Sequence, residues 1–445
     1  MIFVCVCALL AIVAISYSLA SSWIGGLPKL NYAYNTGATA PAPYPDANFA
    51  VISDLHIYDH SLGTEGAAFD AAMKSDRKLL LDSVDLLDYA IDDILRSNAR
   101  FVLVSGDLTK DGELINHNIS AEMLARLTDA GLQVYVVPGN HDISCYDAVS
   151  YSGSAVTPVE TVTPEEFASI YADFGYDNAI ERDPHSLSYM AEPVDGLLLL
   201  VIDACRYREN RPGQDTIVGG KISQATADWI AGVLSAASES QKAVMVLMHH
   251  GIVAHWDGQQ KLHPDYLIED YRHFGEFLAS HHVRLAFTGH YHAQDITRGA
   301  FRDGTYIYDV ETGSLVTAPC PIRYCSIKDN TFTVKSVNIV DKIHPGTDFA
   351  RNATDFVKAT VVLEAFNTLK KYRVSDKDAE YIADAVGDAF VAHYKGDENP
   401  DERAVLDKSL LSFWGRFILF MQQYVLNGLW ADLYPADNDA AFSLD

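Results

Sequence analysis

The octapeptide FAVISDLH, residues 49–56, is an apolar run followed by polar residues, and this order recurs later in the chain. An unbroken apolar run of this kind predicts a strand that is buried on both faces. Asp54 and His56 follow at once, and both can bind a metal ion. Residues 101–109, FVLVSGDLT, have the same order, with Asp107 after the apolar run. Because the loops at the carboxyl ends of strands converge in an open α/β sheet, these side chains are predicted to share one site.

The same alternation continues along the chain. Strands are predicted at 49–53, 101–105, 134–137, 197–202, 243–248, 283–288 and 306–310, and amphipathic helices at 79–97, 120–130 and 223–237. Strands that alternate with helices predict an α/β fold in which helices cover a buried sheet. Residues 143–186, rich in Tyr, Ser and Thr, are interpreted as an insertion near the site.

The pattern changes after residue 342 to helical periodicity alone. Helices are predicted at 356–372, 377–394 and 409–430. We therefore expect a catalytic domain at 47–342 and a smaller, all-helical C-terminal domain at 343–445. The last of these helices is strongly apolar, but Arg416, Gln422 and Gln423 interrupt it, so we expect it to pack on the catalytic domain instead of crossing a membrane.

The beginning of the chain predicts export. Residues 1–22 are interpreted as a signal peptide or a membrane anchor, because the run from Met1 to Ala20 is apolar and uncharged and ends in small residues. No basic residue precedes the run, and its length approaches that of a bilayer span, so an uncleaved anchor is the alternative. Residues 23–46 are expected to be a linker. The protein is expected to be extracellular or anchored at the cell surface, with membrane contact only through an uncleaved N-terminal segment.

Charge and cysteine content limit the classes of function. The net charge of -27 argues against a nucleic-acid partner, because such binding needs clustered Lys and Arg. A small anionic substrate would need local positive charge, which metal ions can supply. Four cysteines lie beyond the N-terminal segment, which is too few for a disulfide framework. Cys320 and Cys325 could pair across a short loop or remain free thiols.

Five polar clusters each follow a predicted strand. In chain order they are Asp54-Leu55-His56, Gly106-Asp107, Gly139-Asn140-His141-Asp142, His249-His250 and Gly289-His290-Tyr291-His292. Each cluster alone has a simpler interpretation, as a turn, a cap or a surface histidine pair. Their common position after buried strands favours a shared metal site. Carboxylate, amide and imidazole donors together suit Mn, Fe or Zn.

This ordered set resembles the defining pattern of calcineurin-like metallophosphoesterases, over residues 48 to about 340. The resemblance implies a β-sandwich flanked by helices, in four αββα layers, that binds two divalent or trivalent metal ions. It implies that Asp54, His56 and His292 hold the first ion, that Asn140, His249 and His290 hold the second, and that Asp107 bridges both. Purple acid phosphatases of this family have a tyrosine ligand three residues after the bridging aspartate, and this chain has Lys110 there.

The resemblance also implies a mechanism. A hydroxide that bridges the metals would attack phosphorus, and His141 would protonate the leaving oxygen. Asp142 is expected to orient His141 through a ring nitrogen, as carboxylates often do for imidazoles. The alternative for Asp142 is a plain turn cap.

Two further features resemble class III cyclic-nucleotide phosphodiesterases. These are Ile202-Asp203 followed by the GGKIS segment at 219–223, and the helical region after the core. The expected function is therefore a phosphoric diester hydrolase for cyclic 3′,5′-nucleotides or similar small phosphodiesters. His250, Tyr291 and Trp256 are the candidates for contact with that substrate, and the alternative for each is a structural role in its loop. The alternatives are a phosphomonoesterase or nucleotidase and a non-catalytic binding protein, although the complete ligand set argues against the latter.

Overall fold

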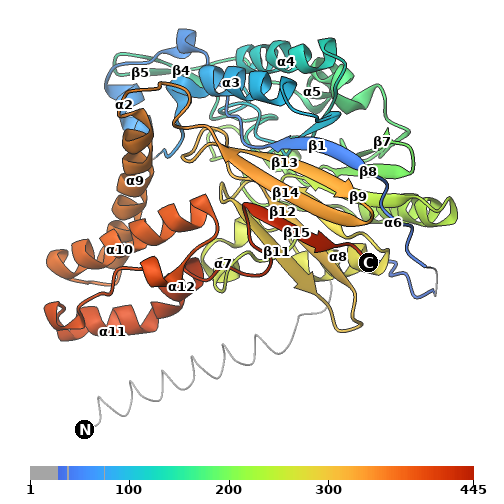
Figure 1. Cartoon of the computed structure of the whole chain (residues 1–445). Helices are drawn as coiled ribbons and strands as arrows, with labels where there is room; N and C mark the ends of the chain where they lie inside the picture. Colours follow the sequence, from blue (N-terminus) through green and yellow to red (C-terminus); the bar gives the residue numbers. More distant parts are fainter. Residues whose placement is uncertain (1–28, 38–39, 75) are drawn as a thin grey trace.

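Two β-sheets packed face to face form the centre of the molecule in the computed structural model, which describes residues 29–37, 40–74 and 76–445 (Figure 1). The six-stranded sheet has the order β15 (Asp439–Ser443), β14 (Thr331–Asn338), β13 (Pro321–Lys328), β1 (Ala47–Ile52), β2 (Phe101–Val104) and β3 (Gln133–Val136). The seven-stranded sheet has the order β11 (Asp295–Ala300), β12 (Tyr306–Glu311), β10 (Leu285–Thr288), β9 (Ala243–Met248), β8 (Leu197–Ile202), β7 (Tyr189–Val194) and β6 (Glu181–Arg182).

Parallel pairing brings the ends of the central strands to the same edge. Ile52 of β1 lies opposite Val104 of β2, which in turn lies opposite Val136 of β3. In the other sheet, β9 is parallel to both β8 and β10. The polar residues that follow these strands therefore leave both sheets at a common edge, as the sequence predicted.

Aromatic side chains join the two sheets in the interior. Phe49 stacks on Phe101 of the neighbouring strand, with ring centroids 4.8 Å apart. Phe287 of the other sheet meets Phe49 edge-on at 5.3 Å. All three rings are fully buried. Because edge-to-face pairs add to the stabilisation from area burial, this contact fixes how the sheets face each other.

Helices cover the outer faces of both sheets. On one side lie α3 (Ser83–Leu95) and α4 (Leu114–Asp129), and on the other lie α6 (Gln224–Glu239) and α8 (Tyr271–Ser280) (Figure 1). The buried residues of α3 are spaced for a single helical face: Leu86, Leu87, Ala90, Ile91 and Ile94. The predicted four-layer fold is confirmed. The shorter elements are α2 (Ala67–Met73), β4 (Val149–Ser152), β5 (Ala155–Pro158), α5 (Pro164–Ile170) and α7 (Gln259–Leu262).

The C-terminal region is largely helical and lies to one side of the sandwich (Figure 1). Its helices are α9 (Phe349–Lys371), α10 (Asp376–Lys395), α11 (Phe413–Met421) and α12 (Gln423–Leu429). The sequence predicted one helix at 409–430, but the backbone turns at Gln422, where φ is -104° and ψ is 9°. Within the described part of the chain, no helix is long and apolar enough to cross a membrane.

The last strand, β15, returns to the six-stranded sheet. It pairs antiparallel with β14, and Phe442 stacks on Tyr308 with ring centroids 3.9 Å apart. The prediction of an all-helical C-terminal domain was therefore wrong for the last residues. A strand of five residues with only two buried side chains has a weak pattern, so its pairing is set by the partner strand.

The structure also describes part of the predicted linker and two of the cysteines. The described part of the predicted linker packs on the catalytic domain instead of extending away from it: Tyr32 stacks on Phe277 at 5.3 Å, and the Tyr44 hydroxyl donates to the Val244 carbonyl at 2.7 Å. Cys320 and Cys325 are both buried and free, so the structure does not contain the pairing that the sequence left open. The predicted signal peptide or anchor lies outside the described residues.

Candidate active site

The candidate metal ligands lie on strained backbone just past the strand ends. Five of them have left-handed conformations, with φ of 52° at Asp54, 39° at His56, 50° at Asp107, 75° at His290 and 67° at His292. A positive φ is uncommon for residues other than glycine and costs energy that the surrounding structure must offset. Such residues cluster at functional sites, where the strained backbone aims the side chain.

Neighbouring glycines make this close approach of loops possible. A Cβ atom at Gly289 would lie 2.0 Å from Ser53 Oγ and 2.6 Å from Asp54 Oδ2. A Cβ atom at Gly139 would lie 2.1 Å from Asp107 Oδ1. No side chain fits at either position, so the glycines in these two motifs are required sterically.

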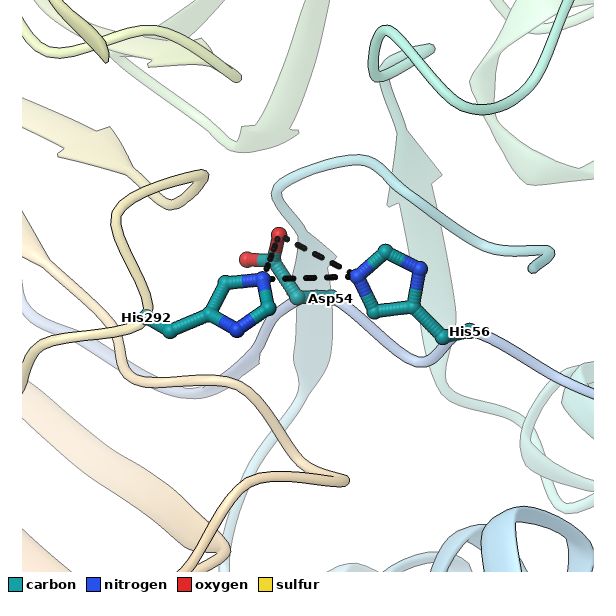
Figure 2. Close-up of side chains that lie close together, drawn as sticks. All are labelled: Asp54, His56 and His292. Atoms are coloured by element: carbon teal, nitrogen blue, oxygen red, sulfur yellow. Dashed lines mark hydrogen bonds and ion pairs between the residues drawn. The ribbon is translucent and has the colours of Figure 1, made fainter. Parts of the chain in front are cut away.

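One group of donors forms around Asp54 (Figure 2). Asp54 Oδ1 lies 3.3 Å from His292 Nε2 and 3.9 Å from His56 Nε2. The two Nε2 atoms are 3.4 Å apart. Asp54 and His56 are fully buried, and Asp54 Oδ1 has no hydrogen-bond partner among the described residues. The three side chains predicted for the first metal therefore point at one another.

A second group forms around Asp107. Asp107, His249 and His290 lie within one cluster, and Asp107 Oδ2 is 3.4 Å from His249 Nε2. Asn140 Oδ1 is 3.1 Å from the same His249 nitrogen. Asp107 Oδ2 is also 3.7 Å from His56 Nε2 of the first group. Asp107 therefore stands between the two groups, in the position that a bridging ligand requires.

The two groups fit metal ions on geometric grounds. Donors about 2.1 Å from a shared ion lie about 3.0–3.4 Å from one another in tetrahedral or octahedral arrangements. Several donor pairs in both groups match this spacing. Without a cation, the buried Asp54 oxygen would remain unpaired, which is unfavourable. Carboxylate, amide and imidazole donors are borderline-hard ligands, so ions such as Mn, Fe or Zn suit them.

Protonation of the donors also fits metal binding. Although burial opposes ionisation, His249 and His141 hold the pKa of the Asp107 carboxyl well below its usual range. Burial and the charge of Lys78 lower the pKa of His56, so this imidazole stays neutral. Burial opposes a charge on His249, but Asp107 outweighs it and raises its pKa to about 9. Metal binding at His249 would therefore release a proton.

Backbone carbonyls fix the orientation of two candidate imidazoles. His249 Nδ1 donates to the Ser105 carbonyl at 2.8 Å, and His56 Nδ1 donates to the Thr109 carbonyl at 3.2 Å. In the neutral imidazole, each bond places the remaining proton on Nδ1 and leaves a lone pair on Nε2, which faces the site. This is the arrangement by which second-layer hydrogen bonds set the tautomer of ligating histidines.

The partner of His141 differs from the prediction. His141 Nδ1 donates to Asp111 Oδ1 at 2.8 Å. Asp142 instead accepts from the Gly139 and Thr109 backbone amides at 2.8 and 3.0 Å, so it caps the turn. The prediction that Asp142 orients His141 was wrong, because one Asp142 oxygen is occupied by its own loop and the other by Thr109 of the Asp107 loop. Asp111, four residues after Asp107, was overlooked, and only its acidic character near that motif could have indicated it.

Of the three candidate substrate contacts, one lines the pocket beside the donor groups and two do not. Tyr291 lines a pocket of about 190 Å³ that also contains Asp107, Asn140, His141, His290 and His292. His250 is fully buried, and its Nε2 donates to the Val218 carbonyl at 2.9 Å. Trp256 is 1% exposed and does not line this pocket. For His250 and Trp256 the alternative of a structural role therefore holds, because both side chains are used in packing and neither lines this pocket.

Sequence reasoning missed part of the pocket wall. Arg77, Lys78, Tyr266 and Tyr394 line it, and Tyr394 belongs to α10 of the C-terminal region. Arg77 Nη1 donates to the Tyr394 hydroxyl at 2.7 Å, and Arg77 Nη2 lies 3.7 Å from Glu364 on α9. The C-terminal helices thus complete the pocket and hold one of its cationic side chains. No local signal marked these residues, because the contact spans more than 300 positions of sequence.

Comparison with known proteins agrees with this geometry. A family model for the calcineurin-like phosphoesterase domain matches residues 47–294, more than half of the chain. The chain belongs to the calcineurin-like phosphoesterase family. It is therefore a phosphoester hydrolase by family, and its two donor groups fit two metal ions.

Solved structures with a similar fold are distant in sequence. A dimetal phosphatase from Danio rerio is 16% identical, with a TM-score of 0.46 over 66% of this chain and 96% of that one. The purple acid phosphatase PPD1 from yellow lupin is 12% identical, with a TM-score of 0.39 over 67% and 52% of the two chains. An NAD nucleotidase from Haemophilus influenzae is 13% identical, with a TM-score of 0.34 over 72% and 56%. No curated protein sequence matches the chain.

Proposed function

We propose that this phosphoesterase is a metal-dependent phosphodiesterase that hydrolyses cyclic 3′,5′-nucleotides or similar small phosphodiesters. The observation that carries the proposal is the pocket itself, which joins both donor groups and His141 to a wall of three tyrosines: Tyr266, Tyr291 and Tyr394. A diester has two organic groups on phosphorus, so its site must offer apolar surface beside the phosphate. Aromatic rings can provide such surface for a nucleoside base.

The donor groups define where the phosphate would bind. We propose that Asp54, His56 and His292 hold one metal ion, that Asn140, His249 and His290 hold another, and that Asp107 is shared. When bound, two such ions would polarise the phosphoryl oxygens and lower the pKa of water. The identity of the ions, Mn, Fe or Zn, belongs to this proposal as well.

His141 is the residue that we assign to the leaving group. Its side chain is partly exposed in the pocket, and Asp111 holds its Nδ1, so Nε2 is free to face an ester oxygen. Burial opposes protonation, but Asp107 and Asp111 outweigh burial and raise the pKa of His141. A protonated imidazole in this position can donate to a departing alkoxide.

A second candidate is a phosphomonoesterase or nucleotidase, which the cationic side of the pocket favours. Arg77 and Lys78 line the same pocket as the donor groups. A monoester carries more negative charge than a diester, and guanidinium groups bind phosphate oxygens in a bidentate manner. Lys78 is balanced in part by Asp76, whose Oδ2 lies 3.7 Å from the Lys78 ammonium. Because Asp76 reduces the positive charge of this side of the pocket, a phosphodiesterase remains our first proposal.

A comparison of substrates tests this choice. We expect the purified chain in Mn²⁺ to cleave bis-p-nitrophenyl phosphate faster than p-nitrophenyl phosphate, and to convert 3′,5′-cyclic AMP to a monoester. Rates of product formation under matched conditions give the answer. A strong preference for the monoester would replace the first proposal by the second. A metal-loaded protein that turns over none of the three compounds would favour the non-catalytic alternative.

Arg77→Gln is expected to raise KM by about 10- to 100-fold, because it removes a charge-assisted hydrogen-bond donor from the pocket. The effect should be larger for p-nitrophenyl phosphate than for the diester, since the monoester has the extra charge. Steady-state kinetics on both substrates measure this difference. Arg351→Gln is the matched control, because Arg351 is an exposed arginine of α9 that pairs with the exposed Asp348. Unchanged KM values for Arg77→Gln would remove Arg77 from substrate binding.

Export remains a proposal. The apolar, uncharged N-terminal residues support a location outside the cytoplasm, either released or anchored through that segment. The acidic balance supports a small-molecule substrate and no nucleic-acid partner. Fractionation of cells that express the full chain tests the location directly.

A further inference from the structure

A buried cluster of acidic and imidazole side chains lies where the C-terminal helices meet the catalytic domain. Asp295 is the first residue of β11, His393 is near the end of α10, and Glu398 follows that helix. These side chains are 2%, 1% and 6% exposed, respectively. They are not among the candidate ligands of the active site, so the pocket chemistry does not account for their burial.

The three side chains converge on one point. One donor atom from each lies within 4.8 Å of the other two. His393 Nδ1 contacts Glu398 Oε1 and lies 3.9 Å from Asp295 Oδ2. The second oxygen of the Glu398 carboxylate has no hydrogen-bond partner among the described residues. A buried carboxylate oxygen without a partner is costly, and a cation beside it would remove that cost.

The surroundings leave this cluster short of positive charge. His255 Nδ1 is 2.7 Å from Asp295 Oδ1, and its Nε2 is 3.2 Å from Glu311 Oε2. The buried charged side chains that adjoin one another here are Asp295, Asp309, Glu311, Glu398, Asp437, Arg323, His255 and His393. With His393 neutral, as a metal ligand must be, and the other groups ionised, five carboxylates face two cations, an excess of three negative charges. Buried charge without compensation is strongly unfavourable, and one divalent cation would reduce the excess to a single negative charge.

We propose that Asp295, His393 and Glu398 bind a third divalent cation, separate from the two ions of the active site. One imidazole and two carboxylates suit zinc or manganese better than calcium, which prefers oxygen ligands alone. The cation would join β11 of the catalytic domain to the end of α10. Tyr394 directly follows His393 and contacts Arg77 in the pocket, so the same ion would hold the pocket wall in place.

Protonation is the competing way to neutralise the cluster. Burial raises the pKa of Glu311 and of Asp437 well above the usual range, with neighbouring acids adding to the effect. Two protons on these groups would reduce the excess of negative charge by the same amount as one divalent cation. The two explanations differ in metal content, which can be measured without any substrate.

The test uses a full-length variant in which Asp54→Asn, Asp107→Asn and His249→Ala remove the active-site ligands. After expression in zinc and manganese and exhaustive dialysis, elemental analysis should find about one metal ion per chain. Adding Glu398→Gln to this variant should reduce that value to near zero. Asp341→Asn is the matched control, because Asp341 is exposed and pairs with the neighbouring Lys342. It should leave the metal content unchanged.

Thermal unfolding gives a second readout that does not depend on activity. A chelator should lower the melting temperature of the active-site variant, and it should have no such effect once Glu398→Gln is present. A folded active-site variant that holds no metal would overturn the proposal, whether or not the Glu398 variant folds. A metal ion that remains after Glu398→Gln would overturn it as well.

Discussion

Asp107→Asn is expected to reduce turnover of any phosphoester by about 10³-fold or more, since charge stabilisation by a metal pair contributes several kcal/mol. Asp107 Oδ2 stands 3.4 Å from His249 Nε2 and 3.7 Å from His56 Nε2, so it faces both donor groups. An amide in its place has one oxygen and no negative charge. The variant should therefore hold the two ions less tightly as well as react more slowly.

Elemental analysis and steady-state kinetics on the same preparation test both parts of this expectation. Asp88→Asn is the matched control, because Asp88 is an exposed aspartate of α3 that pairs with Arg126. It should have wild-type metal content and turnover. Wild-type turnover by Asp107→Asn would exclude Asp107 as a shared ligand, and the two-metal proposal would then fail.

His141→Ala is expected to slow cleavage of an alkyl ester by about 10²- to 10⁴-fold, the usual contribution of a general acid. An alkoxide is a poor leaving group and needs a proton as it departs. p-Nitrophenolate is a stable anion and leaves without one, so chromogenic esters should be affected much less. Metal content should be unchanged, because His141 belongs to neither donor group.

Two neighbouring aspartates provide the controls for His141. Asp111→Asn should show the same dependence on the leaving group in weaker form, because Asp111 orients His141 through its Nδ1. Asp142→Asn should reduce stability without that dependence, since Asp142 caps the loop through the Gly139 and Thr109 amides. If His141→Ala slows both kinds of ester equally, His141 does not act on the leaving group.

The structure brings together the residues that the sequence indicated as metal ligands, and the reason is geometric. Each candidate ligand follows directly after a buried apolar strand, and parallel strands bring their ends to the same edge. At these positions, the place of a residue directly after a strand was therefore enough to predict which distant residues lie beside it in the fold. The α/β class followed from the same alternation of strands and helices, and the four-layer arrangement followed from the family resemblance.

The rest of the site depends on contacts that no local pattern encodes. Asp142 and Asp111 are both acidic and both near motifs, and only three-dimensional packing shows that Asp111 reaches His141. Trp256 looked available because it lies in a loop, but its Nε1 donates to the Tyr291 hydroxyl at 3.1 Å inside the core. Arg77 is held by Glu364 of α9 and Tyr394 of α10, and both helices belong to the C-terminal part of the sequence.

The pairing of β15 with β14 changes how the C-terminal helices can be removed. These helices are an insertion between two neighbouring strands of one sheet, not an appendage at the end of the chain. A stop codon after residue 342 would delete four helices and also strip an edge strand, leaving Phe332 without its neighbour Phe442. An internal deletion that joins Asn338 to Asp439 through a short turn would instead preserve the sheet. Only the internal deletion would show the effect of removing the helices without also removing the edge strand of the sheet.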